Sequence, residues 1–446
     1  MSDFGIVGGG PAGLLMALLL ARRGHAVQVF ERRGDPRQMR AEAGRSINLA
    51  LAARGIRALR EAGVLAALQD QLVPMRGRQL HHTDASQQFA AYGARGDEYI
   101  LSASRAQLTR ALAQQAGNTA GITLHFCVTC TGLNDEGAPL LQTAQGDTVT
   151  APTAARWIGA DGAGSALRQA LQARGALQVQ EQFIAHDYKE LDIPPGTPLV
   201  REALHIWPRG GFMLIALPNA DGSFTATLFL AREGEVSFAA LRSADVVQAF
   251  FAREFADAAA LIPNLAAQWA AHPQGRLGSV HTTPWHQGEQ LVLLGDAAHA
   301  MVPFHGQGMN CAFEDCRILD ALLADGHAAP FARFYAQRKP AADAIIQMAL
   351  ENHAEMSDTV RRPRFHLQRE LALQLQQRHP QRFVPRYAMV TFRDDIGYDV
   401  ALQRGRIQQQ LLDAMTVPAA DGSLPDVATL DWPHWDAQVT AQLAPL

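Results

Sequence analysis

Three glycines and one acid near the N-terminus have the types and spacing of a dinucleotide-binding site. Gly8, Gly10 and Gly13 form the pattern G-x-G-x-x-G, and Glu31 follows at close to the separation of about 20 residues that such sites use. The first glycine allows a tight turn, the second lets a pyrophosphate approach the backbone, and the third lets a helix pack on a strand. A carboxylate at Glu31 would accept the hydroxyls of an adenosine ribose and would repel a 2′-phosphate. The pattern therefore predicts FAD or NAD here and disfavours NADP.

A second stretch, residues 291–315, offers groups that suit an anion. Its first four residues are apolar and predict a short buried strand, which Gly295 and Asp296 end. Gly306 and Gly308 then form a permissive turn before a predicted helix. A helix start has free N–H groups and a positive dipole end, which suit a phosphate or a ring that becomes anionic. The alternative is that the loop is simply the way the chain leaves a strand.

The patterns around the first glycines predict the elements that their motif needs. Residues 4–7 predict a strand, an apolar helix follows the glycines and ends at Gly24, and residues 26–30 predict a second strand. The glycines therefore lie in a strand, turn and helix, which is the context that a dinucleotide site requires.

Further along the chain the pattern changes twice. Short strand patterns between residues 176 and 280, together with residues 71–100, predict an inserted antiparallel sheet. From residue 331 onward, long helical patterns rich in Gln, Arg and Ala follow. One of these places Asn352 within an apolar stripe, where it must find buried partners, and a neighbouring backbone group is the simplest.

Composition excludes several classes of function. The 446 residues are 48% hydrophobic and predict two or three domains, while 39 Lys and Arg against 43 Asp and Glu give no nucleic-acid footprint. Four cysteines are too few for a disulfide framework, and no signal peptide or bilayer-spanning segment is evident, so we expect a soluble protein of the cytoplasm. Cys127 and Cys130 have metal-like spacing, but they lie in an alternating run that predicts strand residues, and we expect no metal.

Two further motifs carry a resemblance to a known family. The stretch from Arg156 to Arg168, which contains Asp161, and the pair Gly295-Asp296 resemble motifs of the class A flavoprotein monooxygenases, the flavin-dependent aromatic hydroxylases. Together with the first glycine motif they fall in that family's order. Longer blocks narrow the resemblance to kynurenine 3-monooxygenases, from about Gly5 to about Gln410, and these blocks are residues 44–51, 74–78, 92–93, 99–105, 205–209, 212–219 and 383–392.

The resemblance implies an α/β fold in which a Rossmann-like FAD-binding domain carries an inserted antiparallel β-sheet substrate domain and a C-terminal helical domain. The expected boundaries are residues 1–70, 101–175 and 281–330 for the discontinuous FAD-binding domain, 71–100 and 176–280 for the sheet, and 331–446 for the helices. From the motifs and the resemblance, the residues expected to bind FAD are Gly8, Gly10, Gly13, Glu31, Arg45, Asn48, Arg105, Asp161, Asp296, Gly306, Gly308, Met309 and Asn310.

The resemblance also implies a reaction. NADPH would reduce FAD, the reduced flavin would take up O2 as a C4a-hydroperoxide, and one oxygen would pass to L-kynurenine ortho to its ring amine, giving 3-hydroxy-L-kynurenine. Because the cofactor carries this chemistry, we expect no dedicated catalytic residue, only groups that position the ring and exclude water. No second glycine pattern exists for NADPH, which agrees with a nicotinamide that visits transiently.

Substrate binding calls for a forked cation opposite the kynurenine carboxylate, and the resemblance assigns this role to Arg78. Arg76, two positions away, would point to the same face if both lay in a strand, and the alternative is an arginine that faces solvent or the flavin. Tyr92 and Tyr387 are expected in the substrate pocket, but either could instead be an ordinary half-buried core residue. His299 and His305 could act as general acids or could be structural. The residues expected in or near the pocket are Arg78, Tyr92, Asn352 and Tyr387, with Phe304, His305, Glu355 and Met356.

Two rival functions stay open on the sequence alone. One is a class A hydroxylase of another anthranilate- or tryptophan-derived ring, and the other is a flavin-binding protein that does not oxygenate. Animal members of the family carry a C-terminal membrane anchor, whereas this chain has no apolar span there, which fits a soluble, bacterial-type version. The resemblance assigns no function to the residues after Gln410.

Overall fold

The structure is a computed structural model that describes residues 3–38, 48–93, 96, 98–150, 156–357 and 362–446. Arg45 therefore lies outside the described residues, as does the side chain of Met356. No described helix is long and apolar enough to cross a membrane.

A parallel sheet forms the centre of the first layer. Its strand order is β18-β19-β12-β1-β2-β8, and the five strands from β19 to β8 run parallel, while β18 pairs antiparallel at one edge. The strands are β1 (Phe4–Val7), β2 (Val27–Glu31), β8 (Ile122–Phe126), β12 (Arg156–Gly159), β18 (His286–Gln287) and β19 (Leu291–Leu293). The predicted strands at residues 4–7, 26–30 and 291–294 are thus confirmed to within a residue or two.

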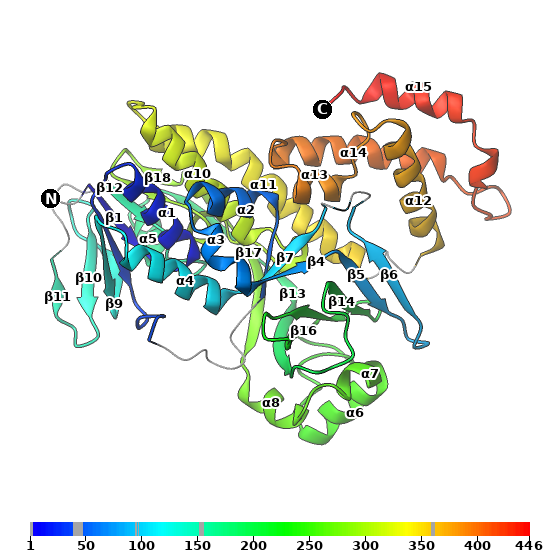
Figure 1. Ribbon diagram of the computed structural model, residues 1–446, viewed down its shortest axis with the longest axis horizontal. Helices are drawn as coiled ribbons and strands as arrows, with labels where there is room; N and C mark the ends of the chain where they lie inside the picture. The colour runs from blue at the N-terminus through cyan, green and yellow to red at the C-terminus, as the bar shows by residue number, and fades with distance from the viewer. Residues whose placement is uncertain (1–2, 39–47, 94–95, 97, 151–155, 358–361) are drawn as a thin grey trace.

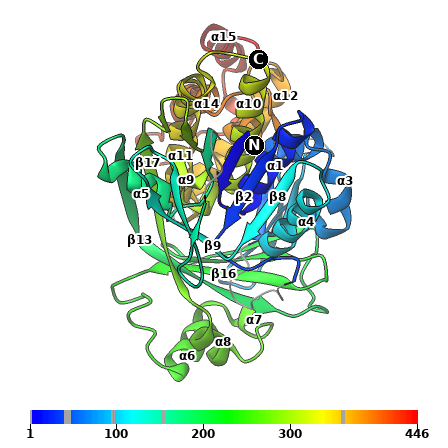
Figure 2. The same ribbon diagram turned by 90° about the vertical axis from the view of Figure 1, so that its left-hand side faces the viewer.

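Helices cover the parallel sheet and explain its apolar sequence. α1 is buried from Gly13 to Leu20 because the sheet covers one side and neighbouring helices cover the other. Figures 1 and 2 show these helices grouped around the sheet. They are α1 (Pro11–Arg22), α2 (Ala53–Glu61), α3 (Leu65–Leu68), α4 (Arg105–Gly117), α5 (Ala166–Ala173), α9 (Asp296–His299) and α10 (Gly308–Ala324).

A larger, mostly antiparallel sheet forms the second layer. Its order is β17-β13-β16-β15-β14-β5-β6, and only β14 and β5 pair parallel. Its strands are β5 (Gly77–His81), β6 (Gln87–Ala91), β13 (Gln178–Ile193), β14 (Ala203–Pro208), β15 (Met213–Pro218), β16 (Phe224–Ala231) and β17 (Gln274–Thr283). One face packs on α6 (Ala244–Glu254), α7 (Ala256–Ala259) and α8 (Leu265–Ala271), which lie beneath the sheet in Figure 2.

Two small sheets and a helical region complete the chain. The small sheets have the orders β11-β10-β9 and β3-β7-β4, and their strands are β9 (Val128–Leu133), β10 (Pro139–Thr143), β11 (Thr148–Val149), β3 (Asn48–Leu51), β4 (Leu72–Met75) and β7 (Ile100–Ser104). The helical region contains α11 (Pro330–Ser357), α12 (Pro363–Arg378), α13 (Arg386–Phe392), α14 (Tyr398–Met415) and α15 (Trp432–Gln442), of which α12 to α15 lie at the right of Figure 1. The expected fold class is confirmed, whereas the domain boundaries remain a prediction.

The strand assignment of Cys127 was wrong. Only Cys130 lies in a strand, β9, while Cys127 sits between β8 and β9 with a φ of 58°. The chain leaves the parallel sheet at this point and enters the three-stranded sheet, and the bend between them needs a left-handed residue.

Candidate active site

A cavity of about 400 Å³ lies between the parallel sheet and the larger sheet. Its volume is in the range of small-molecule sites. Gly10 and Gly162 line it from the loops that follow β1 and β12, Asp296 lines it from the start of α9 just after β19, and Gly308 lines it from the start of α10. These loops meet because the carboxyl ends of parallel strands share one edge of a sheet, which is where open α/β sheets bind ligands.

Glycine suits each of the three positions of the N-terminal motif for a different structural reason. Gly8 has a φ of 109°, and a Cβ there would lie 2.3 Å from the carbonyl oxygen of Ala160. A Cβ on Gly13 would lie 1.9 Å from the Gly8 carbonyl oxygen. A Cβ on Gly10, in contrast, would meet no protein atom within 4 Å, although Gly10 lines the cavity. The space beside Gly10 is thus open to a ligand, and the chain fits a dinucleotide pyrophosphate there.

Glu31 lies at the end of β2 as a buried carboxylate. Its Oε2 accepts from the Gly9 N–H at 2.7 Å, and its Oε1 accepts from the Arg33 N–H at 2.9 Å. Burial alone would raise the pKa of Glu31, but the hydrogen bonds and charge of Arg33 outweigh it and lower that pKa. The carboxylate is therefore ionised and keeps lone pairs for ribose hydroxyls.

The other predicted cofactor residues divide into two groups. Asn48, Arg105 and Asp296 line the cavity. Asp161 instead binds its own chain, because its Oδ2 accepts from the Ala166 N–H at 2.7 Å at the start of α5, and its Oδ1 is buried without a hydrogen-bond partner among the described residues.

The start of α10 also brings predicted residues to the cavity. Gly306, with a φ of 66°, Gly308 and Met309 line it. Asn310 is fully buried, and its side chain turns away to hold the segment after β3, since Oδ1 accepts from the Ala52 N–H at 2.8 Å. What Asn310 can offer a cofactor is thus its backbone N–H in the first turn of the helix, where N–H groups have no intrahelical partner.

Arg78 lies on β5 with its guanidinium beside two tyrosines. Its Cζ lies 4.7 Å from the ring centroid of Tyr387 and 5.6 Å from that of Tyr92, and the two rings stack at 5.6 Å. All three residues line the cavity. The Arg78 Nε and the Tyr92 hydroxyl are buried without a hydrogen-bond partner in the part of the chain that the structure describes. Buried donors without partners are rare, and a cation among them calls for an anionic ligand.

Arg76 faces solvent, which was one of the alternatives for it. Arg76 falls between β4 and β5, so the two-residue rule for one strand does not apply to it. Its side chain is 51% exposed and pairs with Glu202 at 2.9 Å instead of entering the cavity.

Phe304 and His305 line the same cavity as Arg78 and its tyrosines. The imidazole of His305 stacks on Tyr387 with centroids 5.6 Å apart. Burial lowers the pKa of His305 to about 3, and the cations Arg386 and Arg78 act in the same direction. His305 is therefore uncharged at neutral pH in this structure and does not fit a general acid. His299 lies outside the cavity lining and contacts Asp315 at 2.6 Å.

Two predicted pocket residues, Asn352 and Glu355, lie on α11 outside the cavity lining. Asn352 donates from Nδ2 to the Phe304 carbonyl oxygen at 2.6 Å, which is the backbone partner that its apolar surroundings require. Glu355 lies 4.0 Å from Arg386 and adds a negative charge that raises the pKa of Arg78. Neither side chain belongs to the cavity lining, so both support it from outside.

Sequence reasoning missed the floor of the cavity, which the larger sheet provides. Tyr188 and Glu190 point into it from β13, and Glu190 is only 3% exposed with its Oε1 unpartnered among the described residues. Burial raises the pKa of Glu190 to about 7, Asp192 adds to the rise, and Arg105 opposes it. Side chains alternate between the two faces of β13, so the sequence places Glu190 on one of these faces. Which face is buried, however, depends on the sheet around the strand.

Glu190 should make the stability of the FAD-free protein depend on pH. A carboxyl whose pKa is raised by folding stabilises the fold fully below its unfolded pKa, and this contribution is lost as pH rises through about 7. We expect Glu190→Gln to remove this loss, so that the melting temperature of the variant relative to the wild type rises from about pH 5 to about pH 7 and levels off at higher pH. Melting curves of FAD-free protein test this, with the exposed Glu235→Gln as control. A temperature difference between Glu190→Gln and wild type that does not change with pH would contradict the assignment.

Comparisons with known proteins identify the family of the chain. The family described as FAD binding domain matches residues 1–349. Two kynurenine 3-monooxygenases, from Stenotrophomonas maltophilia and Xanthomonas axonopodis pv. citri, are each 49% identical, and the alignments cover 98% and 99% of this chain and 96% and 97% of theirs.

Solved structures share the fold at lower identity. Pseudomonas aeruginosa PqsL in complex with 2-aminobenzoylacetate superposes with a TM-score of 0.64 at 21% identity, covering 80% of this chain and 97% of that one. The tetrameric form of 2-methyl-3-hydroxypyridine-5-carboxylic acid oxygenase gives 0.64 at 19% identity, covering 79% and 90%. The resemblance that the sequence motifs carry is confirmed by the full-length relatives. The chain belongs to the kynurenine 3-monooxygenase family of FAD-dependent enzymes.

Proposed function

We propose that the protein hydroxylates L-kynurenine ortho to its ring amine and releases 3-hydroxy-L-kynurenine, with FAD as cofactor and NADPH and O2 as co-substrates. Family membership supports this reaction at 49% identity over nearly the whole chain. The observation that carries the substrate assignment is Arg78, a buried cation whose Nε has no hydrogen-bond partner among the described residues, inside a cavity beside the cofactor loops.

The chain's own residues would hold FAD along the edge of the parallel sheet. Gly10 leaves space for the pyrophosphate, Glu31 offers a carboxylate to the ribose, and Asp296 offers one to the ribityl chain. When bound, FAD would supply reduction by NADPH and activation of O2. The start of α10 would favour negative charge on the adjacent ring through its dipole and free N–H groups.

Substrate positioning would depend on Arg78 and the two tyrosines. A guanidinium presents two parallel N–H groups that match a carboxylate, so the amino-acid end of kynurenine would bind at Arg78. The hydroxyls of Tyr92 and Tyr387 would donate to the same end of the substrate. The aromatic ring would then lie among apolar side chains that exclude water, namely Met213, Ile215, Phe229 and Phe304.

The division into domains is part of the same proposal. We propose three domains with the boundaries expected from the sequence. The four cysteines are free, which supports a reducing compartment such as the cytoplasm.

NADPH consumption by the purified, FAD-loaded protein tests the proposed reaction. We expect L-kynurenine to accelerate NADPH oxidation and to yield 3-hydroxy-L-kynurenine, because a bound ring displaces water from the cavity. Anthranilate, which has a ring amine but no α-amino acid end, serves as the comparison substrate. If anthranilate is hydroxylated and kynurenine is not, the protein acts on another ring of this class. If neither ring changes NADPH oxidation, the hydroxylase assignment fails.

Arg78→Ala should weaken substrate binding without releasing FAD. We expect KM for L-kynurenine to rise roughly 100-fold, because a buried charge pair with the carboxylate is lost at a cost of about 3 kcal/mol. Arg76→Ala is the matched control, since its side chain lies outside the cavity, and should leave KM unchanged. Steady-state kinetics and flavin absorbance measure both effects. Loss of FAD from Arg78→Ala, or equal KM changes in the two variants, would count against the assignment.

Two alanine substitutions should distinguish a glycine that the fold requires from a glycine that FAD binding requires. Gly13→Ala places a Cβ against the Gly8 carbonyl, so it should destabilise the FAD-free protein by roughly 1–3 kcal/mol. Gly10→Ala adds a methyl group to open space, so it should leave the melting temperature of the FAD-free protein unchanged but weaken FAD binding roughly tenfold or more by occupying the pyrophosphate position. Calorimetry of the FAD-free protein and FAD titration measure the two effects. Unchanged FAD affinity in Gly10→Ala would place the pyrophosphate elsewhere.

A further inference from the structure

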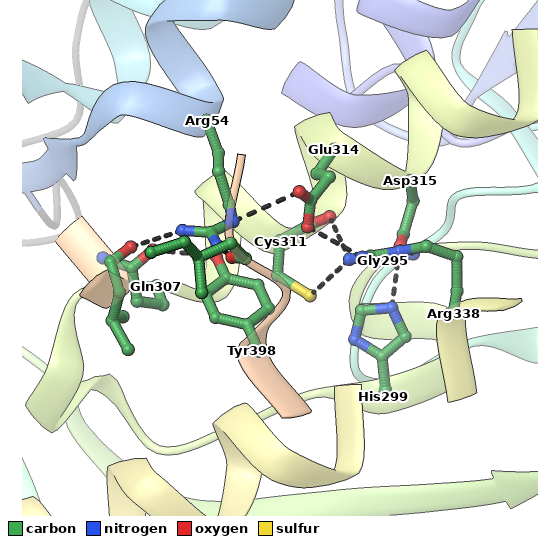
Figure 3. Close-up of polar contacts among 11 residues, drawn as sticks. Arg54, Gly295, His299, Gln307, Cys311, Glu314, Asp315, Arg338 and Tyr398 are labelled. Atoms are coloured by element: carbon green, nitrogen blue, oxygen red, sulfur yellow. Dashed lines mark hydrogen bonds and ion pairs between the residues drawn. The ribbon is translucent and has the colours of Figure 1, made fainter. Parts of the chain in front are cut away.

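A buried arginine joins the first domain to the C-terminal helices. Arg54 on α2 is 2% exposed, and its Nη1 donates to the carbonyl oxygen of Val390 at 2.5 Å. Its Nη2 donates to the carbonyl oxygen of Ile396, and its Nε binds Glu314 of α10 at 3.1 Å. Figure 3 shows the Arg54 side chain with a dashed line to Glu314. One side chain thus satisfies two buried carbonyls at the end of α13 and just before α14, and so fixes both helices against α2 and α10.

The same guanidinium covers a tyrosine that reaches the cofactor turn. Its Cζ lies 4.0 Å from the ring centroid of Tyr398, the first residue of α14. The Tyr398 hydroxyl donates to Gln307 Oε1 at 2.9 Å. Burial raises the pKa of Tyr398 well above its ordinary range, so the hydroxyl stays protonated and remains a donor. Gln307 lies between Gly306 and Gly308, which both line the cavity.

A second branch of the network reaches the other cofactor loop. Glu314 also binds Arg338 at 2.7 Å, and Arg338 binds Asp315 at 2.7 Å. Asp315 then accepts from the Gly295 N–H at 3.0 Å, directly before the cavity residue Asp296. Burial opposes the charge of Asp315, but His299 and Arg338 outweigh it and lower its pKa.

This branch is an ion network and does not fit a cation site. His299, Cys311 and Asp315 have ligand atoms close enough together to hold a metal ion. The guanidinium of Arg338, however, lies 3.3 Å from the Cys311 Sγ and binds Asp315, so the positive charge in this cluster comes from the chain itself.

We propose that Arg54 and Tyr398 are positioning residues that couple the substrate side of the cavity to its cofactor side. The helix that Arg54 fixes, α13, carries Tyr387, whose ring faces Arg78 at 4.7 Å. The residue that Tyr398 holds, Gln307, sets the turn at the start of α10. A shift of the C-terminal helices would therefore change the substrate contacts and the cofactor turn together. This inference rests on the proposed hydroxylase function for its kinetic test.

The Tyr398 hydroxyl can be removed alone. We expect Tyr398→Phe to keep FAD bound and to change KM for L-kynurenine less than twofold, while the yield of 3-hydroxy-L-kynurenine per NADPH falls about fivefold, because Gln307 loses a buried hydrogen bond and the turn loosens. Gln307→Met should lower the yield similarly, and the double variant should be no worse than either single variant. Tyr335→Phe is the control, since its ring packs on Trp285 with centroids 5.8 Å apart and not under Arg54.

Arg54 should affect both sides of the cavity. We expect Arg54→Met to raise KM for L-kynurenine and to lower the product yield, and Arg54→Lys to restore neither, since an ammonium cannot reach two carbonyls and Glu314 in a fork. Arg57→Met is the matched control on the same helix. Arg57 is 40% exposed and binds Glu61 at 2.8 Å and Asp394 at 3.4 Å, so its loss should leave KM and yield unchanged. If Arg54→Met does not fold, the tyrosine series decides alone.

The outcomes separate this inference from the proposed function. A wild-type yield in Tyr398→Phe, or a double variant whose defects multiply, would overturn the coupling. If the wild type does not hydroxylate kynurenine, the absorbance and fluorescence of bound FAD provide the readout. Matching spectral changes in Tyr398→Phe, Gln307→Met and their double variant would then support the coupling, and unchanged spectra in Tyr398→Phe would overturn it.

Discussion

Burying a guanidinium is the constraint on which this structure depends. A cation taken out of water is stable only with close hydrogen-bond acceptors and negative charge. Arg54 and Arg338 meet this condition within the chain, through backbone carbonyls, Glu314 and Asp315. Arg78 has tyrosines and the charge of Glu355 nearby, but its Nε stays without a partner among the described residues. The difference separates arginines that hold the fold from the arginine that is prepared for a ligand.

The fold brings this prepared cation to the cofactor by placing two sheets edge to face. The loops after β1, β12 and β19 lie at the carboxyl end of the parallel sheet, and the larger sheet provides the floor of the cavity with Tyr188, Glu190 and Arg78. The other face of that sheet packs on α6, α7 and α8, so the strands are buried on one side and free to carry polar side chains on the other. Neither sheet alone would enclose a site from which water can be excluded.

Local patterns were sufficient for the parts of the site that depend on neighbours in sequence. The strand, turn and helix around Gly8, Gly10 and Gly13 follow from short-range sterics, and so does the turn before α10. An error arose at Cys127, which lies outside the predicted strand, at the bend between two sheets. Arg76 lies between two strands, so its direction could not be fixed by the two-residue repeat of either one. Contacts between distant segments, such as Arg54 with Ile396, depend on how domains pack and carry no local signal. The position of Glu190 likewise depends on strand pairing, because a slip of one residue would turn it to the other face.

The buried network is better explained by geometry than by stability. Buried ion pairs are weak evidence for stability, because their desolvation opposes the attraction and apolar residues of similar volume often serve as well. Apolar residues would not fix the relative orientation of the helices, since they can pack in several arrangements with similar energies. Arg54, Glu314, Arg338 and Asp315 each have defined donors or acceptors, and displacing one leaves a buried charge without a partner. Such a network resists small shifts of α13 and of the Gly306–Gly308 turn relative to each other. That is the requirement of a cavity in which a ring on one side must meet a cofactor on the other within a few tenths of an ångström, and it explains why polar groups occupy a position that a hydrophobic core could have filled.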